Sequence, residues 1–152
     1  MKDSALMTEI EKAYMAGFLD GEGCISIRYD RGGTQLRLAI TQTNIEQLDE
    51  ISNVWGGRLY ISPGKVKFSQ LSWCGQAALP ILKAVLPYLK LKQKQAKLAI
   101  FYLEELCNNG CNLTSSQWSC RIEVYRLIKQ LNSDTYKYGR NGQRKTEVGI
   151  DS

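Results

Sequence analysis

A stripe of small residues follows one face of a predicted helix near the start of the chain. A capping box at Thr8 is followed by apolar side chains at helical spacing, which predicts a helix over residues 9–22. Ala13, Gly17 and Gly21 recur every four residues, so they share one face of that helix. Glycine inside a helix costs about 1 kcal/mol relative to alanine. The stripe is therefore best explained by a second backbone that packs against it.

Two carboxylates lie at the C-terminal end of the same predicted helix. Asp20 and Glu22 are disfavoured there because the helix dipole is negative at that end. A bound cation would reverse the sign of this interaction, which indicates a metal site below a helix–helix contact. The chain has no histidine, so hydrolysis at neutral pH would need water activated by a carboxylate, a lysine of shifted pKa, or a metal. The carboxylates at the helix end favour the metal.

Charge is distributed unevenly along the 152 residues, a length that suits one domain. The net charge is +5, and residues 74–102 carry five lysines and no acid. This pattern indicates an anionic partner, nucleic acid rather than membrane, or else a solvated basic face. The five cysteines are irregularly spaced, which argues against zinc and favours reduced thiols. The first residues lack an apolar run of the length expected for a signal peptide, and no stretch approaches the ~20 apolar residues expected for a membrane span.

Hydrophobic periodicity predicts an α+β domain over residues 1–131 and a polar, basic tail over 132–152, which we expect to be mobile without a ligand. The element order is αββαββααα, with two hairpins that form one four-stranded antiparallel sheet. The expected strands are 24–30, 35–42, 58–62 and 65–73, with a hairpin loop at 31–34 and a turn at 63–64. The expected later helices are 45–55, 76–86 (disturbed by Pro80), 92–107 and 116–131.

One face of the predicted sheet is polar, which is common for a solvated antiparallel sheet. Its mixture of basic, amide and acidic side chains could also read base edges in the major groove of DNA. A strand of seven residues spans about 23 Å, or roughly 7 base pairs, so one chain would cover half a site. The candidate DNA-binding residues on this face are Ser26, Arg28, Asp30, Gln35, Arg37, Thr41, Tyr60, Ser62, Lys65, Lys67 and Ser69.

Two segments resemble the LAGLIDADG homing endonucleases, in particular the single-motif, homodimeric, intron-encoded branch. Residues 15–23 (MAGFLDGEG) resemble the signature helix, and residues 87–96 (PYLKLKQKQA) resemble a second conserved block. The resemblance extends over roughly residues 10–131. It implies the homing-endonuclease fold, in which helices cover one face of a saddle-shaped sheet.

The resemblance also implies a function. It implies a homodimer that cleaves both strands of a long, pseudo-palindromic double-stranded DNA by metal-dependent hydrolysis and leaves short 3′ overhangs. Mg²⁺ is the expected cofactor; Mn²⁺ is expected to substitute, and Ca²⁺ to bind without supporting cleavage. The implied dimer interface comprises Ala13, Gly17, Phe18 and Gly21.

The resemblance assigns roles to individual residues. Glu22 and the carbonyl of Gly21 match metal ligands, and Asp20 matches a structural acid at the helix end. Gln42 matches a residue that positions water. Lys92 matches a lysine near the scissile phosphate, which acts by charge stabilisation or by proton transfer. Further DNA contacts are expected from Lys94, Lys137 and Arg140.

Several alternatives stay open. Relatives often carry a basic residue where this chain has Glu46, so either Arg58 or Lys65 replaces it or the water pocket is less basic. An intron maturase acting on RNA, a DNA-binding protein that does not cut, and a module that binds no nucleic acid are the rival functions. The resemblance suggests the product of a chloroplast or mitochondrial intron.

Overall fold

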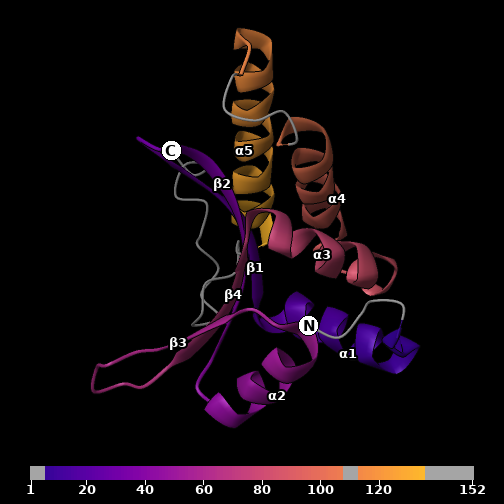
Figure 1. Ribbon diagram of the computed structural model, residues 1–152, viewed down its shortest axis with the longest axis vertical. Helices are drawn as coiled ribbons and strands as arrows, with labels where there is room; N and C mark the ends of the chain where they lie inside the picture. The colour runs from indigo at the N-terminus through magenta and orange to yellow at the C-terminus, as the bar shows by residue number, and fades with distance from the viewer. Residues whose placement is uncertain (1–5, 108–112, 136–152) are drawn as a thin grey trace, which may run out of the picture.

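The computed structural model describes residues 6–107 and 113–135 of the chain (Figure 1). The described elements confirm the α+β class and the predicted order of helices and strands. They are α1 (Glu9–Glu22), β1 (Gly23–Asp30), β2 (Gly33–Gln42), α2 (Ile45–Trp55), β3 (Arg58–Ile61), β4 (Ser69–Cys74), α3 (Leu79–Val85), α4 (Gln93–Phe101) and α5 (Ser115–Thr135), with short helical turns η2 (Gly75–Ala78), η3 (Leu86–Tyr88) and η4 (Tyr102–Leu106).

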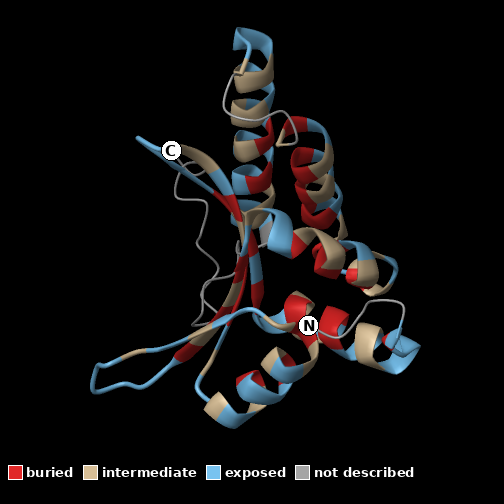
Figure 2. Cartoon of the chain, in the orientation of Figure 1, coloured by how far each residue is buried: buried red, intermediate tan, exposed pale blue. Residues whose placement is uncertain are grey.

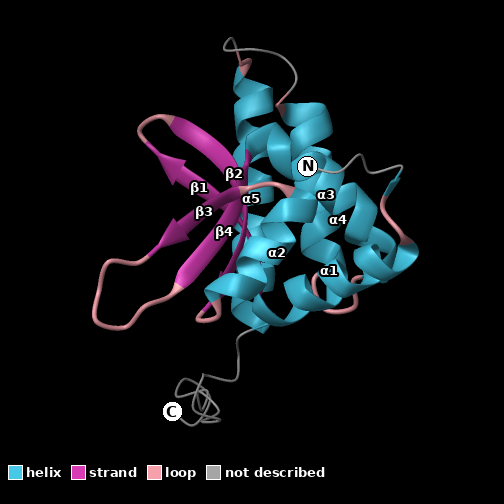
Figure 3. Cartoon of the chain, turned by 60° about the horizontal axis from the view of Figure 1, so that its bottom comes forward, coloured by secondary structure: helices cyan, strands magenta, loops and turns pink. Residues whose placement is uncertain are grey.

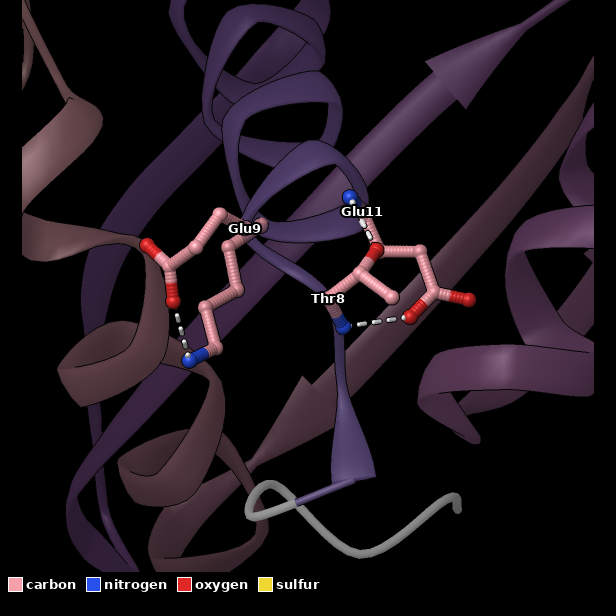
Figure 4. A network of polar contacts seen from close by, with 4 residues as sticks. Thr8, Glu9 and Glu11 are labelled. Carbon is pink, nitrogen blue, oxygen red and sulfur yellow. Dashed lines mark hydrogen bonds and ion pairs between the residues drawn. The ribbon is translucent and has the colours of Figure 1, made fainter.

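Helix α1 begins at the predicted capping box. The Glu11 amide donates to the Thr8 hydroxyl oxygen at 3.1 Å, and the Thr8 amide donates to the Glu11 carboxylate at 2.9 Å (Figure 4). Lys12 pairs with Glu9 on the neighbouring face at 3.2 Å. These contacts satisfy donors that every helix N-terminus leaves free, so the start of α1 is well defined.

The four strands form one antiparallel sheet in the order β1-β2-β4-β3. The helices lie on one side of it, and the other side is open (Figures 1 and 3). Buried residues alternate with less buried ones along β1 and β4, so one side of the sheet faces the core (Figure 2). The side chains of the strands that are buried toward the helices are Ile25, Ile27, Leu36, Leu38, Ile40, Leu71 and Trp73. The two hairpins thus supply the sheet side of the core.

The predicted second hairpin was wrong in its last strand. Strand β4 begins at Ser69 rather than at residue 65, and residues 62–68 form a connection. Leu71 and Trp73 take the inward positions of the strand, which places Ser69 inward as well. Val66 and Phe68, which were expected to face the core, are 78% and 38% exposed. The two larger apolar residues of β4 therefore fix its register.

Other boundaries differ by a few residues. The first hairpin connection is Arg31 and Gly32 alone, since β2 already begins at Gly33. Pro80 lies in the first turn of α3, where its missing N–H costs nothing, so it begins a helix rather than disturbing one.

Helix α5 continues to Thr135, four residues beyond the predicted end. The Asn132 amide nitrogen donates to the carbonyl of Ile25 at 2.9 Å, which ties this last turn to β1. Residues 136–152 lie outside the described part, so the boundary between domain and tail stays a prediction. None of the described helices combines the length and the apolar character needed to span a bilayer.

Tyr102 joins the helical layer to the sheet and supplies a test of the packing. Its side chain is 1% exposed, and its hydroxyl donates to the Thr34 hydroxyl oxygen at 2.7 Å. Burial raises the pKa of Tyr102 from 10.0 to about 12. Between these two values the unfolded chain loses the phenolic proton and the folded chain keeps it.

We therefore expect the contribution of the buried Tyr102 hydroxyl to the free energy of unfolding to be complete below pH 10. Between pH 10 and pH 12 it should fall by about 1.4 kcal/mol per pH unit. Urea unfolding of wild type and Tyr102→Phe over pH 9–12 measures it, because other titrations are common to both proteins. The free energy of unfolding of the wild type should fall relative to that of the variant, by about 3 kcal/mol in total. A constant difference between the two proteins would contradict the assignment.

Candidate functional site

The carboxylate of Asp20 holds the segment before α4 against the end of α1. One of its oxygens accepts from the amide of Lys90 at 2.7 Å, and the other accepts from the amides of Leu91 and Lys92 at 3.1 and 3.0 Å. These three donors lie 70–72 residues further along the chain. The placement agrees with the structural role expected for Asp20. We call this arrangement the Asp20 clamp.

The clamp predicts a difference in stability between two neighbouring carboxylates. Asp20→Ala removes three charge-assisted hydrogen bonds and should lower the free energy of unfolding by about 2–4 kcal/mol. Glu22→Ala is the matched control, because it removes an exposed carboxylate from the negative end of the helix; its effect should stay within about 0.5 kcal/mol. Urea denaturation of both variants measures the two effects. Equal stabilities would show that the clamp contributes nothing.

Lys92, whose amide is one of the three donors of the Asp20 clamp, is only 3% exposed. Its ammonium nitrogen donates to the main-chain carbonyl of Asp20 at 2.6 Å. Burial lowers the pKa of Lys92, while the charges of Asp20, Cys24 and Glu22 act in the opposite direction. The ammonium of Lys92 therefore lies beside the acidic end of α1, although Lys92 and Asp20 are 72 residues apart in the sequence. One donated bond leaves two of its three N–H donors for another acceptor.

Glu22 is the last residue of α1 and its side chain is exposed. Within the described residues its carboxylate makes no hydrogen bond and no ion pair. The neighbouring carbonyl of Gly21 lies in the last helical turn, where carbonyls lack an intrahelical donor. No group of three or more His, Cys, Asp and Glu side chains that could hold a metal occurs in the described ranges. The Glu22 carboxylate and the Gly21 carbonyl are oxygen atoms of the kind that hard cations prefer, and both lie at the end of α1.

Gln42 ends β2 next to this corner of the molecule. Gly23 pairs with Ile40, so β2 continues two residues past the end of α1. The Gln42 side-chain oxygen accepts from the Thr43 amide at 2.9 Å. The structure thus brings Glu22, Lys92 and Gln42 to one end of the sheet, and their roles stay predictions. Glu46 is exposed in the first turn of α2. Its side chain is acidic, so it does not supply the basic residue that relatives often carry at this position.

The small-residue stripe of α1 is exposed on the described chain. Ala13, Gly17 and Gly21 are all exposed, and a Cβ added at either glycine would meet no atom within 4 Å. Ile10 and Tyr14 are 81% and 53% exposed beside the stripe. Phe18 is half-buried and packs against the core. The glycines therefore make no close contact within the chain, and the stripe is open to a partner.

The open face of the sheet carries most of the predicted DNA-binding residues. Cross-strand pairing places Ser26 beside Arg37, Arg28 beside Gln35, and Thr41 beside Gln70. The remaining predicted residues of this face are Asp30, whose carboxylate lies 3.5 Å from the Arg28 side chain, and Tyr60, which pairs with Gln70.

Four residues that were assigned to the open face of the sheet lie elsewhere. Ser69 is fully buried, and its hydroxyl has no partner among the described residues, so it cannot contact DNA from the open face. Lys65 and Lys67 are exposed, but they lie in the connection 62–68 rather than on a strand. Ser62 is in the same connection, where its hydroxyl accepts from the Gly64 amide at 3.3 Å.

The same change of register reveals residues that sequence reasoning missed. Gln70, Ser72 and Cys74 occupy the open face of β4, and Arg58 pairs with Ser72. Their signal was the alternation with Leu71 and Trp73.

The Lys94 side chain, a predicted DNA contact, is exposed on α4. Lys137 and Arg140 lie outside the described residues. Cys24, Cys74, Cys107 and Cys120 are free thiols.

Comparison with known families decides what this arrangement belongs to. A family model described as LAGLIDADG endonuclease matches residues 15–103, more than half of the chain. The chain belongs to the LAGLIDADG endonuclease family. The matched region contains the C-terminal part of α1 from residue 15 onward, the whole sheet and the clamped segment before α4, so the family match includes both segments that meet at the clamp.

Solved LAGLIDADG structures confirm the fold. The chain is similar to the homing endonuclease I-CvuI in complex with its target in the presence of Ca, with TM-score 0.69, 24% identity, and coverage of 80% of this chain and 82% of that one. It is also similar to the archaeal intron-encoded homing endonuclease I-Vdi141I complexed with DNA (TM-score 0.67, 18% identity, 93% and 91% coverage). The third similar structure, the meganuclease I-AabMI bound to uncleaved DNA, is matched over only 43% of its length (TM-score 0.65, 21% identity, 75% of this chain).

Proposed function

We propose that this LAGLIDADG protein is a homodimeric, divalent-metal-dependent endonuclease that cuts both strands of a long, pseudo-palindromic DNA. The observation that carries the proposal is the Asp20 clamp, which holds buried Lys92 beside the acidic end of α1. The clamp thus brings a buried ammonium near Glu22, whose exposed carboxylate makes no hydrogen bond or ion pair within the described residues. The three solved structures named above are, in their own descriptions, complexes with a DNA target or with DNA.

Two observations support the dimer. The stripe of Ala13, Gly17 and Gly21 is open, as a close helix–helix contact requires. The chain also spans only 43% of the length of I-AabMI, so that one longer chain has room for about two units of this size. Packing of two α1 helices about a two-fold axis gives an isologous interface, and the preferred DNA is then close to palindromic.

The dimer would complete a metal site. Glu22 and the Gly21 carbonyl of each copy supply oxygen ligands, which fit Mg²⁺. Two carboxylates about 5 Å apart repel by about 3 kcal/mol at an effective dielectric of 20, and a bound divalent cation turns this repulsion into attraction. When bound, the metal supplies Lewis-acid activation of water and charge stabilisation on the phosphate.

The protein's own residues would orient the reaction. Lys92 keeps two N–H donors for a phosphate oxygen, and its lowered pKa suits proton transfer as well as charge stabilisation. Gln42 would orient water through its amide at the end of β2. The open sheet face would bind the major groove and hold one phosphodiester of each strand near its Lys92. A non-cleaving DNA-binding protein is the second candidate, and Glu46 is the residue that favours it.

Selection from a random duplex library tests the proposal. We expect a single pseudo-palindromic site to be cut in Mg²⁺ and to be bound but uncut with a chelator. Affinity should fall steeply with salt, by about 0.9 in log affinity per log salt for each phosphate neutralised. Binding without cutting in Mg²⁺ and Mn²⁺ would favour the non-cleaving alternative. Selection of RNA alone would favour a maturase.

A further inference from the structure

Three polar side chains form one hydrogen-bonded unit on the open face of the sheet. The guanidinium of Arg37 donates to the side-chain oxygen of Gln70, and the amide nitrogen of Gln70 donates to the Thr41 hydroxyl oxygen at 3.0 Å. A guanidinium has donors only, so Gln70 must present its oxygen to Arg37 and its NH₂ group to Thr41. The orientation of the amide is therefore fixed by chemistry. We call these three residues the Arg37 unit.

Small neighbours let the unit lie along the sheet. Thr41 and Gln70 are directly opposite each other, while Arg37 is two rows away, opposite Cys74. The row between them holds Ala39 and Ser72, whose small side chains leave room for the long Arg37 side chain. Ala39 is 7% exposed although it lies on the open face, which is what a side chain lying across it produces. The guanidinium is thus held in one place before any ligand binds.

Among the described residues, the hydrogen-bonding groups that the Arg37 unit leaves without a partner are mainly donors. They are the remaining N–H groups of Arg37, the second amide hydrogen of Gln70 and the hydroxyl hydrogen of Thr41. In the major groove guanine presents two acceptors, N7 and O6, whereas adenine and cytosine each present an amino donor. A glutamine that reads adenine bidentately turns its oxygen and its NH₂ group toward one base, whereas here Gln70 turns its oxygen toward Arg37 and its NH₂ group toward Thr41.

We propose that the Arg37 unit selects guanine at one position of each half of the DNA target. In this assignment Arg37 contacts the base, and Gln70 is a specificity-determining residue that positions Arg37. The inference rests on the proposed function, and it names a base preference that family membership does not supply. Because Gln70 and Arg37 act on the same base, their effects on specificity should not add.

Library selection on full-length variants tests the assignment. Arg37→Lys keeps a positive charge but loses the planar fork, and Gln70→Leu removes the positioning contact. Both variants should lose about tenfold or more of the guanine preference at the same base position. The double variant should lose no more than Arg37→Lys alone. Gln130→Leu, the same change at an exposed position of α5 away from the open face of the sheet, should keep the guanine preference at that position.

The outcomes separate this inference from the proposed function. Wild type that selects no duplex would overturn both. Wild type that selects a site, with Gln70→Leu and Arg37→Lys altering different positions or none, would overturn the Arg37 unit alone. Thermal unfolding of each variant checks that the fold is kept, and an unchanged salt slope for Arg37→Lys checks that the loss is of base selection rather than of phosphate contacts.

Discussion

Glu22→Gln is expected to abolish DNA cleavage while leaving DNA affinity largely unchanged. The substitution keeps the size of the side chain but removes the only carboxylate charge at the end of α1 that makes no hydrogen bond or ion pair within the described residues. An amide is a poor ligand for Mg²⁺ compared with a carboxylate. Loss of metal activation should slow cleavage by at least about a thousandfold, or about 4 kcal/mol of barrier. The open sheet face is untouched, so the Kd for the target should change little.

The measurement pairs single-turnover cleavage of the selected site with a binding titration in Ca²⁺. Glu50→Gln is the control, because Glu50 is an exposed carboxylate on α2 with no proposed role. Thermal unfolding should show both variants near wild type, since neither side chain is buried. If Glu22→Gln cuts as fast as Glu50→Gln, Glu22 has no part in the reaction and the metal site at the helix end is wrong.

Local rules in the sequence were sufficient for most of the fold. The capping box at Thr8 gave the start of α1, because each of its two side chains satisfies a specific backbone donor. The alternation of Leu36, Leu38 and Ile40 gave β2 for a similar reason, since only one face of the sheet is buried. Where a local rule had one solution, the prediction was confirmed.

The second hairpin failed because two local patterns conflict. Val66 and Phe68 occupy even positions, whereas Leu71 and Trp73 occupy odd ones, so one regular strand cannot bury all four. Burial of the larger pair wins, and residues 62–68 become a connection. This change buries Ser69 and brings Gln70 to the open face beside Thr41. The sequence shows that the two apolar pairs would face opposite sides of one regular strand. Which pair is buried depends on tertiary packing.

The candidate site depended on long-range contacts that periodicity does not encode. The resemblance named Asp20 and Lys92 separately, and the structure joins them through four hydrogen bonds between the end of α1 and the segment before α4. The burial of Lys92 could not be predicted from a lysine-rich segment, because Lys90 and Lys94 in the same segment are exposed. Only the fold distinguishes the buried lysine from its neighbours.

Gly17→Leu is expected to break the dimer without harming the folded chain. A Cβ at Gly17 meets no atom within 4 Å, so leucine has open space in the monomer. Leucine is also a better helix former than glycine, which should stabilise the isolated chain by up to about 1 kcal/mol. In the proposed dimer the same position faces the backbone of the partner helix, where a leucine side chain prevents close packing. The change should therefore raise the free energy of unfolding of the monomer and weaken association by at least about a hundredfold.

Sedimentation equilibrium at micromolar concentration measures this prediction directly. Wild type should sediment as a dimer and Gly17→Leu as a monomer with an unchanged circular dichroism spectrum. Glu123→Leu, which adds the same side chain at an exposed position of α5, should still dimerise. Because each chain supplies half of the ligands in the proposed metal site, the monomeric variant should also lose cleavage while its Glu22 and Lys92 are intact. A Gly17→Leu protein that sediments as a dimer would place the interface elsewhere, and the acidic ends of α1 would then have no reason to meet.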